Sequence, residues 1–135
     1  MSDYTISRLA DAPDVLGDYP GEMRMLTGHL GTSQVAFTYR RMPQNTGGKG
    51  SYGHRHKTQE EVYYVMSGKL QFKLEDEVID VPEGTVVRVS PEVVRSVWNK
   101  GPDDAVVIVV STKSEDPRSD TESVEDFWPE GDDDS

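Results

Sequence analysis

Hydrophobic and polar residues alternate in several short runs along the chain. Met23 and Met25 are separated by a charged residue, and Leu70, Phe72 and Leu74 are separated by polar ones. A period of two residues is typical of a β-strand, because successive side chains of a strand point to opposite faces of the sheet. The predicted strands cover residues 22–27, 35–41, 62–66, 70–74, 78–81, 86–89, 95–99 and 105–110.

Turn signals separate these runs. Pro43 ends the second run, Ser67-Gly68 separates residues 62–66 from 70–74 in a strand, turn, strand meander, and a polar hairpin follows at Glu75-Asp76-Glu77. Residues 1–21 form an arm with turns and no helix of consequence. Short strands separated by turns predict an all-β sandwich or barrel, and no long amphipathic helix is expected before residue 113.

The segment from residue 113 to residue 135 differs from the rest of the chain. It holds 10 of the 25 acidic residues and only 2 of the 14 basic ones. Val124, Phe127 and Trp128 nevertheless occur at helical spacing behind a possible N-cap at Ser119-Asp120. We expect an acidic C-terminal tail that is either disordered or contains one short helix docked on the barrel.

The 135 residues predict one domain, with a barrel over residues 1–112 and the acidic tail over 113–135. The formal net charge of −11 is concentrated in the tail, and no basic stripe is present. Nucleic acid and anionic membrane surfaces are therefore excluded as expected partners, because both require clustered Lys and Arg.

The chain has no cysteine, so a bound metal would need His, carboxylate or water ligands. The N-terminal residues lack the apolar segment of a signal peptide or membrane anchor. The longest apolar run, residues 105–110, is too short to cross a bilayer. We expect a cytoplasmic protein.

Candidate chemistry is concentrated between residues 48 and 68. Two of the three histidines, His54 and His56, are two residues apart and are followed by Glu61. In an extended segment both imidazoles lie on one face, so with the carboxylate they predict a metal site. Tyr63 falls on the Glu61 face and either lines the pocket or packs in the core. We expect four other polar residues to face solvent: His29, Arg40, Gln71 and Arg88.

The same segment resembles the first motif of the cupin superfamily. Gly48, His54, His56, Glu61 and Gly68 all match its fixed positions, and the resemblance extends over about residues 22–112. It implies an antiparallel jelly-roll β-barrel, a double-stranded β-helix, with a central pocket. It also implies a homodimer and a divalent transition metal (Fe, Mn, Ni or Zn) held by His54, His56 and Glu61.

The second motif of the superfamily is only partly matched. Gly84, Pro91 and Asn99 agree with it, but Glu92 replaces the turn glycine and Arg95 replaces the third histidine. The family register places Arg95 inside the barrel, opposite the histidines.

Two arrangements follow from an inward-facing arginine. In one, the guanidinium of Arg95 pairs with Glu61 and takes the place of the metal. In the other, His54, His56 and Glu61 hold a metal with open positions, and Arg95 receives an anionic group of the ligand. A cation close to a bare divalent ion is unfavourable at low dielectric, so we expect a site that is metal-free or binds metal weakly.

Three classes of function are consistent with this sequence. The first is a small-molecule-binding cupin whose pocket, lined by His54, His56, Glu61, Tyr63 and Arg95, accepts a polar or anionic ligand. The second is a metal-dependent enzyme, a dioxygenase, isomerase or decarboxylase, that uses the same residues. The third is an interaction module in which the acidic tail, with Phe127 and Trp128, recognises a partner.

Overall fold

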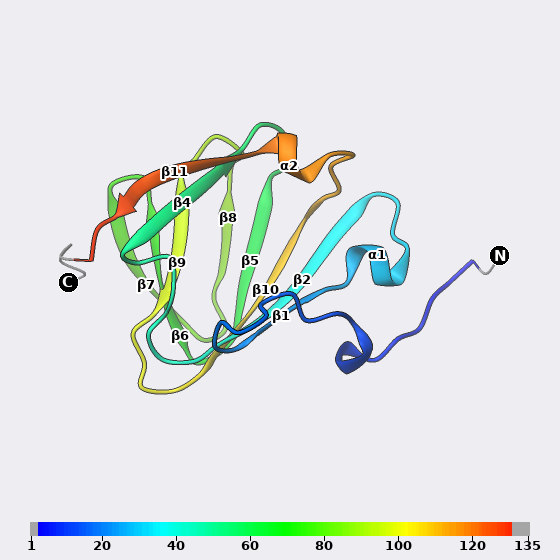
Figure 1. Cartoon of the computed structure of the whole chain (residues 1–135), viewed down its shortest axis with the longest axis horizontal. Helices are drawn as coiled ribbons and strands as arrows, with labels where there is room; N and C mark the ends of the chain where they lie inside the picture. The colour runs from blue at the N-terminus through cyan, green and yellow to red at the C-terminus, as the bar shows by residue number, and fades with distance from the viewer. Residues whose placement is uncertain (1–2, 131–135) are drawn as a thin grey trace.

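The computed structural model describes residues 3–130, which form antiparallel strands joined by turns and three short helices (Figure 1). The strands are β1 (Glu22–Met25), β2 (Val35–Met42), β3 (Thr46–Gly47), β4 (Ser51–His56), β5 (Glu61–Ser67), β6 (Lys69–Leu74), β7 (Glu77–Pro82), β8 (Val86–Val89), β9 (Arg95–Asn99), β10 (Ala105–Thr112) and β11 (Thr121–Trp128). The helices are η1 (Leu9–Asp11), α1 (Thr27–Leu30) and α2 (Pro117–Asp120). In residues 3–130 no helix is long and apolar enough to cross a membrane.

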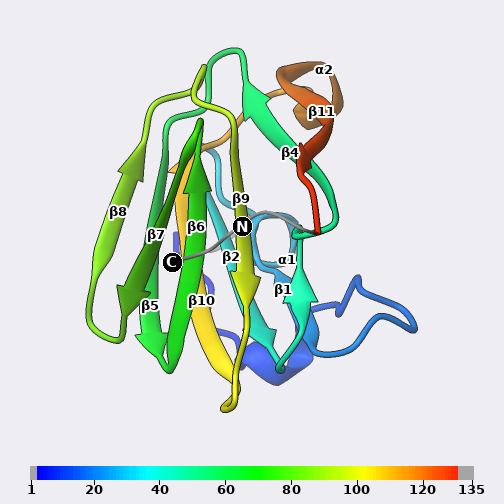
Figure 2. The ribbon, with the colours of Figure 1, turned by 90° about the vertical axis from the view of Figure 1, so that its left-hand side faces the viewer.

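The strands form two sheets that face each other (Figure 2). The first sheet has the order β1-β2-β10-β5-β8; the second has the order β11-β4-β9-β6-β7, and β3 pairs with β9. Because β4 and β5, and then β5 and β6, lie in different sheets, the chain passes repeatedly from one sheet to the other. This is the topology of a jelly-roll barrel, so the predicted fold class is confirmed.

Side chains from the inner faces of both sheets form the core at one end of the barrel. Val65 from the first sheet and Phe72 from the second are both fully buried. The ring of Phe72 meets Tyr63 edge-on, with centroids 5.3 Å apart and an interplanar angle of 90°. This contact places Tyr63 at the border between the packed core and the rest of the barrel interior.

Two local predictions are wrong. Residues 62–74 are not a meander, because Gly68 adopts a φ of 72° and the chain leaves the first sheet there and enters the second. The predicted hairpin at residues 75–77 does join the paired strands β6 and β7. Thr27 is not part of a strand either: it begins the one-turn helix α1, which ends at Gly31 in the left-handed conformation.

Of the two alternatives for the acidic tail, the helix that was to carry Val124, Phe127 and Trp128 is wrong, although a one-turn helix, α2, does occur just before these residues. Residues 121–128 form β11, an edge strand of the second sheet that pairs with β4. A bulge between Val124 and Trp128, where Asp126 has a φ of 54°, inserts extra residues, which is why apolar spacing that suggested a helix occurs in a strand. Trp128 is fully buried within the chain. The remaining acidic tail, residues 131–135, lies outside the described residues.

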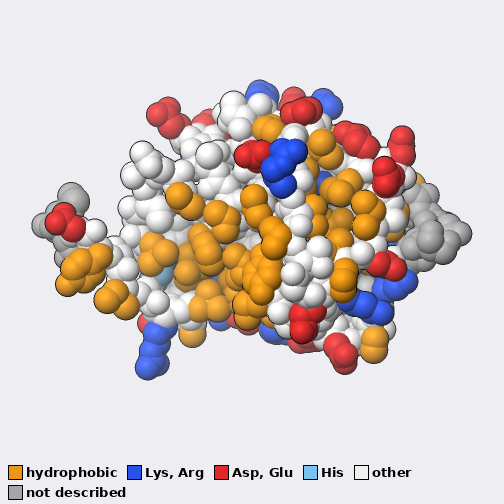
Figure 3. Space-filling model, turned by 180° about the vertical axis from the view of Figure 1, so that it is seen from behind, with side chains coloured by type: hydrophobic (Ala, Val, Ile, Leu, Met, Phe, Trp, Pro, Cys, Tyr) orange, Lys and Arg blue, Asp and Glu red, His pale blue; other side chains and the backbone are white. Residues whose placement is uncertain are grey.

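The outer face of the first sheet carries exposed apolar side chains. Tyr64, Met66 and Val86 have exposed fractions of 40%, 48% and 59%. They alternate along β5 and β8 with the inward-facing residues, and Tyr64 is paired with Val86 across the sheet. Hydrophobic side chains are gathered across the middle of the molecule seen from behind (Figure 3).

Candidate functional site

A cavity of about 490 Å³ opens between the two sheets. Its walls come from the inner faces of β2, β5, β9 and β10, and β4 and the N-terminal arm add Tyr52 and Tyr19. The hydroxyl of Tyr19 accepts a hydrogen bond from the backbone N–H of Gly47 at 2.9 Å, which fixes the arm beside β3. A cavity of this volume is of the size that holds a small molecule.

His54 and Glu61 line one side of this cavity, and His56, which was expected to line it as well, lies beside them but is not among the lining residues. One ligand atom from each residue lies within 4.8 Å of the others. The two imidazole rings, both on β4, have centroids 5.0 Å apart and an interplanar angle of 86°. His54 is about one-third exposed, whereas His56 is buried. The structure therefore brings the three predicted metal ligands together.

One carboxylate oxygen of Glu61 is the centre of the cluster. Tyr63 donates its hydroxyl hydrogen to Oε1 at 2.7 Å. Nε2 of His56 lies 3.4 Å from the same oxygen, and Nε2 of His54 lies 3.6 Å from it. The fourth group is Nη2 of Arg95, at 3.2 Å. The negative charge of Glu61 is thus surrounded by groups that are positive or can donate a hydrogen.

These neighbours determine the protonation states in the cluster. Burial alone would raise the pKa of Glu61, but His54, His56, Tyr63 and the charge of Arg95 hold it far below its ordinary value. Burial and the adjacent Glu61 carboxylate raise the pKa of Tyr63 far above its ordinary range. At neutral pH, Glu61 is therefore a carboxylate and Tyr63 a neutral hydroxyl.

The depressed pKa of Glu61 makes stability depend on pH. Because the folded-state pKa lies below the ordinary value of 4.5, the ionised carboxylate stabilises the fold fully above that value. The stabilisation is lost as the pH falls from about 4.5 toward the folded-state pKa. We expect Glu61→Gln to lower the free energy of unfolding by about 2 kcal/mol at pH 7, measured by urea denaturation. The difference from wild type should shrink at pH 3; an equal difference at both values would contradict this assignment.

Arg95, on β9, is completely buried and faces Glu61, in the direction that the resemblance to the cupin family implied. Its Nη1 donates to the backbone carbonyls of Pro91 at 3.1 Å and Val93 at 2.7 Å, which anchor the guanidinium from behind. Nη2 makes an ion pair with Glu61 but is not aligned for a hydrogen bond, and Nε has no hydrogen-bond partner. Arg95 therefore acts on the cluster mainly through its charge.

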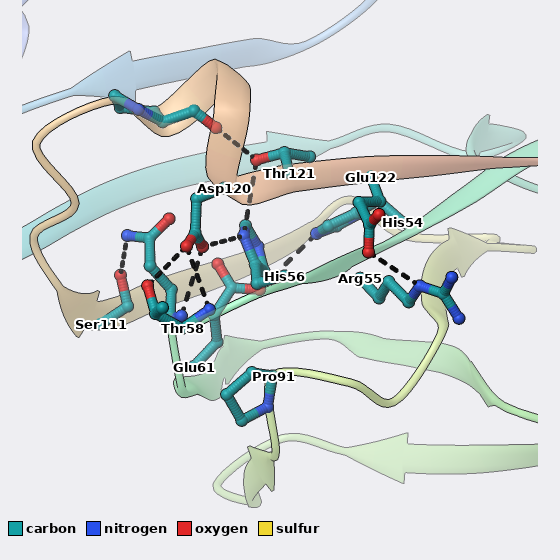
Figure 4. Close-up of polar contacts among 12 residues, drawn as sticks. His54, Arg55, His56, Thr58, Glu61, Pro91, Ser111, Asp120, Thr121 and Glu122 are labelled. Atoms are coloured by element: carbon teal, nitrogen blue, oxygen red, sulfur yellow. Dashed lines mark hydrogen bonds and ion pairs between the residues drawn. The ribbon is translucent and has the colours of Figure 1, made fainter.

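Asp120, which sequence reasoning missed, completes the site from α2 (Figure 4). Its Oδ2 lies 3.2 Å from Nδ1 of His56. The same carboxylate accepts hydrogen bonds from the backbone N–H groups of Thr58 and Gln59 at 3.0 and 3.2 Å, and from the Thr58 hydroxyl. Burial would raise the pKa of Asp120, but these hydrogen bonds and His56 hold it below its ordinary value. Asp120 thus fixes the orientation of the His56 ring.

The cluster has the donor chemistry of a transition-metal site. A protonated His56 ring can donate to both Asp120 and Glu61, whereas a neutral ring that donates Nδ1–H to Asp120 presents the lone pair of Nε2 to Glu61; this buried Nε2 has no aligned hydrogen-bond partner. Two such acceptors repel each other unless a proton or a cation lies between them. A divalent ion fits that position, and a carboxylate on the other imidazole nitrogen is a common feature of metal-bound histidine.

Two of the polar residues expected to face solvent do not. Arg40 lines the cavity, and Gln71 is buried with Nε2 donating to Asp80 at 3.3 Å. The strand of Arg40 has large side chains on both faces, so its inner face could not be recognised from the sequence. The strand of Gln71 does alternate, and Gln71 is buried although the period of two places it on the opposite face from Leu70 and Phe72. His29 is exposed as expected, and so is Arg88, which pairs with Glu60 at 2.8 Å.

A barrel of two antiparallel sheets with a His-His-carboxylate cluster in its cavity defines a small β-barrel protein with an interior site. Residues 41–111, just over half of the chain, match the family model described as the cupin domain. The chain therefore belongs to the cupin family. No match was found among curated proteins.

Several solved structures share the fold. A cupin protein from Bacteroides fragilis is 21% identical with a TM-score of 0.68, covering 85% of this chain and 88% of that one. The polyketide cyclase RemF from Streptomyces resistomycificus is 16% identical with a TM-score of 0.71, covering 92% and 86%. A predicted oxalate decarboxylase from Thermotoga maritima is 18% identical with a TM-score of 0.65, covering 82% and 100%. At these identities the likeness concerns the fold alone.

Proposed function

We propose that the protein binds a small polar or anionic molecule in the cavity between its two sheets and that it binds a divalent metal weakly or not at all. The observation that carries this proposal is the position of Arg95. Its Nη2 lies 3.2 Å from the same Glu61 oxygen that both imidazoles face. A fixed cation therefore already neutralises the carboxylate that a metal would need.

A bound metal would be held by His54, His56 and Glu61. It would supply a Lewis acid that polarises an oxygen of a ligand. Asp120 would fix the orientation of the His56 ring. Arg95 would attract the Glu61 carboxylate and so weaken the bond between this carboxylate and the ion. The competition between Arg95 and a metal for one oxygen supports weak binding.

A metal-dependent enzyme is the second candidate. It is favoured by the buried Nε2 of His56, which has no hydrogen-bond partner although Asp120 orients the ring. Proteins of the same fold include a polyketide cyclase and a predicted oxalate decarboxylase, so the barrel supports chemistry in other chains. The homodimer and the cytoplasmic location stay predictions.

Filling the cavity tests the first candidate. Thr38 lines the cavity on β2, between Met25 and Val109 of the neighbouring strands. A panel of small organic acids and their amides, screened by ligand-observed NMR, should give binders of the wild type. Thr38→Phe should reduce their affinity at least about tenfold, since the ring occupies the space without disturbing the packed core.

Thr112→Phe is the matched control, because Thr112 is exposed at the end of β10 and does not line the cavity. It should leave binding unchanged. If Thr38→Phe binds the same compounds as the wild type with equal affinity, the cavity is not the binding site.

A further inference from the structure

A second arginine, Arg40, projects into the cavity from β2. Its neighbours across the first sheet are Met23 on β1 and Val107 on β10, and all three line the cavity. The next residue, Arg41, faces the other way and pairs with Glu22 at 3.2 Å and Asp104 at 3.1 Å. Two adjacent arginines therefore have opposite environments: one has two carboxylates, and the other has apolar neighbours.

Within residues 3–130 the Arg40 side chain has no ion pair and no hydrogen bond. Its Nε is buried and unpartnered. Burial lowers the pKa of Arg40, and the ionisable groups of the described chain that act on it are the hydroxyls of Tyr19, Tyr52 and Tyr63. The side chain as a whole is partly buried and lines the cavity, so the guanidinium loses part of its hydration without gaining an ion pair, and an anion bound in the cavity would compensate this cost.

Glu61 does not supply that partner. Its Oε1 is already occupied by Arg95, Tyr63 and the two imidazoles, and Arg40 is not among the groups that lower its pKa. Among the described residues, two guanidinium groups and one largely buried carboxylate line the cavity. The positive charge of Arg95 balances the negative charge of Glu61, so the positive charge of Arg40 is left without a balancing carboxylate on the described cavity wall.

Besides these three tyrosine hydroxyls, much of the cavity wall is apolar. The apolar lining residues include Met23, Met25, Met42, Val97, Val107 and Val109. Such a wall favours the hydrocarbon part of a ligand, while a single guanidinium fork favours one planar anionic group. A phosphate monoester carries a charge of about −1.5 to −2, whereas Arg40 supplies a single positive charge, so one carboxylate matches it better.

We propose that the ligand of the cavity is an organic carboxylate whose carboxylate group pairs with Arg40 and whose apolar body packs against the methionine and valine side chains of the wall. This inference rests on the proposed binding function and specifies its ligand class. It assigns anion recognition to Arg40, whereas Arg95 serves as the internal partner of Glu61.

The test compares phenylacetate with its uncharged isostere phenylacetamide, with affinities measured by NMR titration of the full-length protein. The wild type should bind phenylacetate about 10- to 100-fold more tightly, the range expected for a charge-assisted hydrogen bond. Arg40→Gln should reduce this preference to less than about threefold. Arg41→Gln, which removes the same charge from the outer face, should preserve it. Phenyl phosphate should bind more weakly than phenylacetate.

A second variant separates recognition from a structural role. Arg40→Met replaces the unpaired cation with an apolar side chain of similar length, so its Tm without ligand should equal or exceed that of the wild type. It should lose the preference for the carboxylate as Arg40→Gln does.

Failure of the proposed binding function and failure of the inferred ligand class give different results. If neither probe binds the wild type, the proposed binding function fails and this inference fails with it. If both probes bind equally, if phenyl phosphate binds more tightly than phenylacetate, or if the variants of Arg40 keep the preference, the inference is overturned while binding in the cavity stands. A lower Tm for Arg40→Met with an unchanged preference would make Arg40 a structural residue.

Discussion

Replacing Arg95 with histidine should tighten the binding of Zn²⁺ by about 100-fold or more. The substitution removes a cation that lies 3.2 Å from Glu61 and adds an imidazole ligand. A unit charge about 4 Å from another contributes about 4 kcal/mol at an effective dielectric constant of 20, and each 1.4 kcal/mol is tenfold in affinity. Residue 95 lies directly opposite His54 on the paired strands, so the new ring would be beside the existing ones.

The measurement is a titration against a chelator of known affinity, together with the metal content after dialysis. Arg95→Gln removes the charge without adding a ligand and should give only part of the gain. Arg55→His is the matched control: Arg55 lies on β4 between the two histidines but is exposed and pairs with Glu122 at 3.1 Å. Equal affinity of the wild type and Arg95→His would show that Arg95 does not oppose metal binding.

Trp128→Ala should lower the free energy of unfolding by about 3–5 kcal/mol, as expected when a buried tryptophan is truncated. Trp128 is fully buried at the end of β11, opposite Ser51 of β4. Its neighbour Phe127 covers Gly53 so closely that a Cβ at residue 53 would lie 2.4 Å from the ring. These contacts attach β11 to the second sheet.

Urea denaturation measures this effect, with Val124→Ala as the control, since Val124 is only partly buried on the same strand. The control should cost less than about 1.5 kcal/mol. A loss below about 1 kcal/mol for Trp128→Ala would mean that β11 contributes little to the fold. Deleting residues 113–135 would remove β11 as well. Such a deletion would therefore test the stability of the fold as well as the binding of a partner.

The sequence was sufficient to locate one side of the site. The spacing of His54 and His56, combined with the period of a strand, predicted that both imidazoles share a face, and the structure confirms it. The inward orientation of Arg95 came only from the family register, because its own strand has no clear alternation of apolar and polar residues.

The residues that were missed lacked a local signal. Asp120 reaches His56 across the second sheet from a distant part of the chain, and nothing in its neighbourhood indicates that contact. The apolar residues of β11 have the spacing of a helix because the strand contains a bulge around Asp126, which interrupts the period of two. Arg40 follows Phe37 and Tyr39 on a strand with large side chains on both faces, so its inward direction depends on how the two sheets pack.

The contact between Asp120 and His56 also sets an order of events during translation. His54, His56 and Glu61 leave the ribosome well before residues 120–128. Until then β4 is an unpaired edge of the nascent second sheet, and the His56 ring lacks its contact with Asp120. The site can reach its final geometry only when the last strand has been synthesised and added to that edge. A ribosome-bound fragment that ends before residue 117 should therefore be unable to hold ligands as the released chain does.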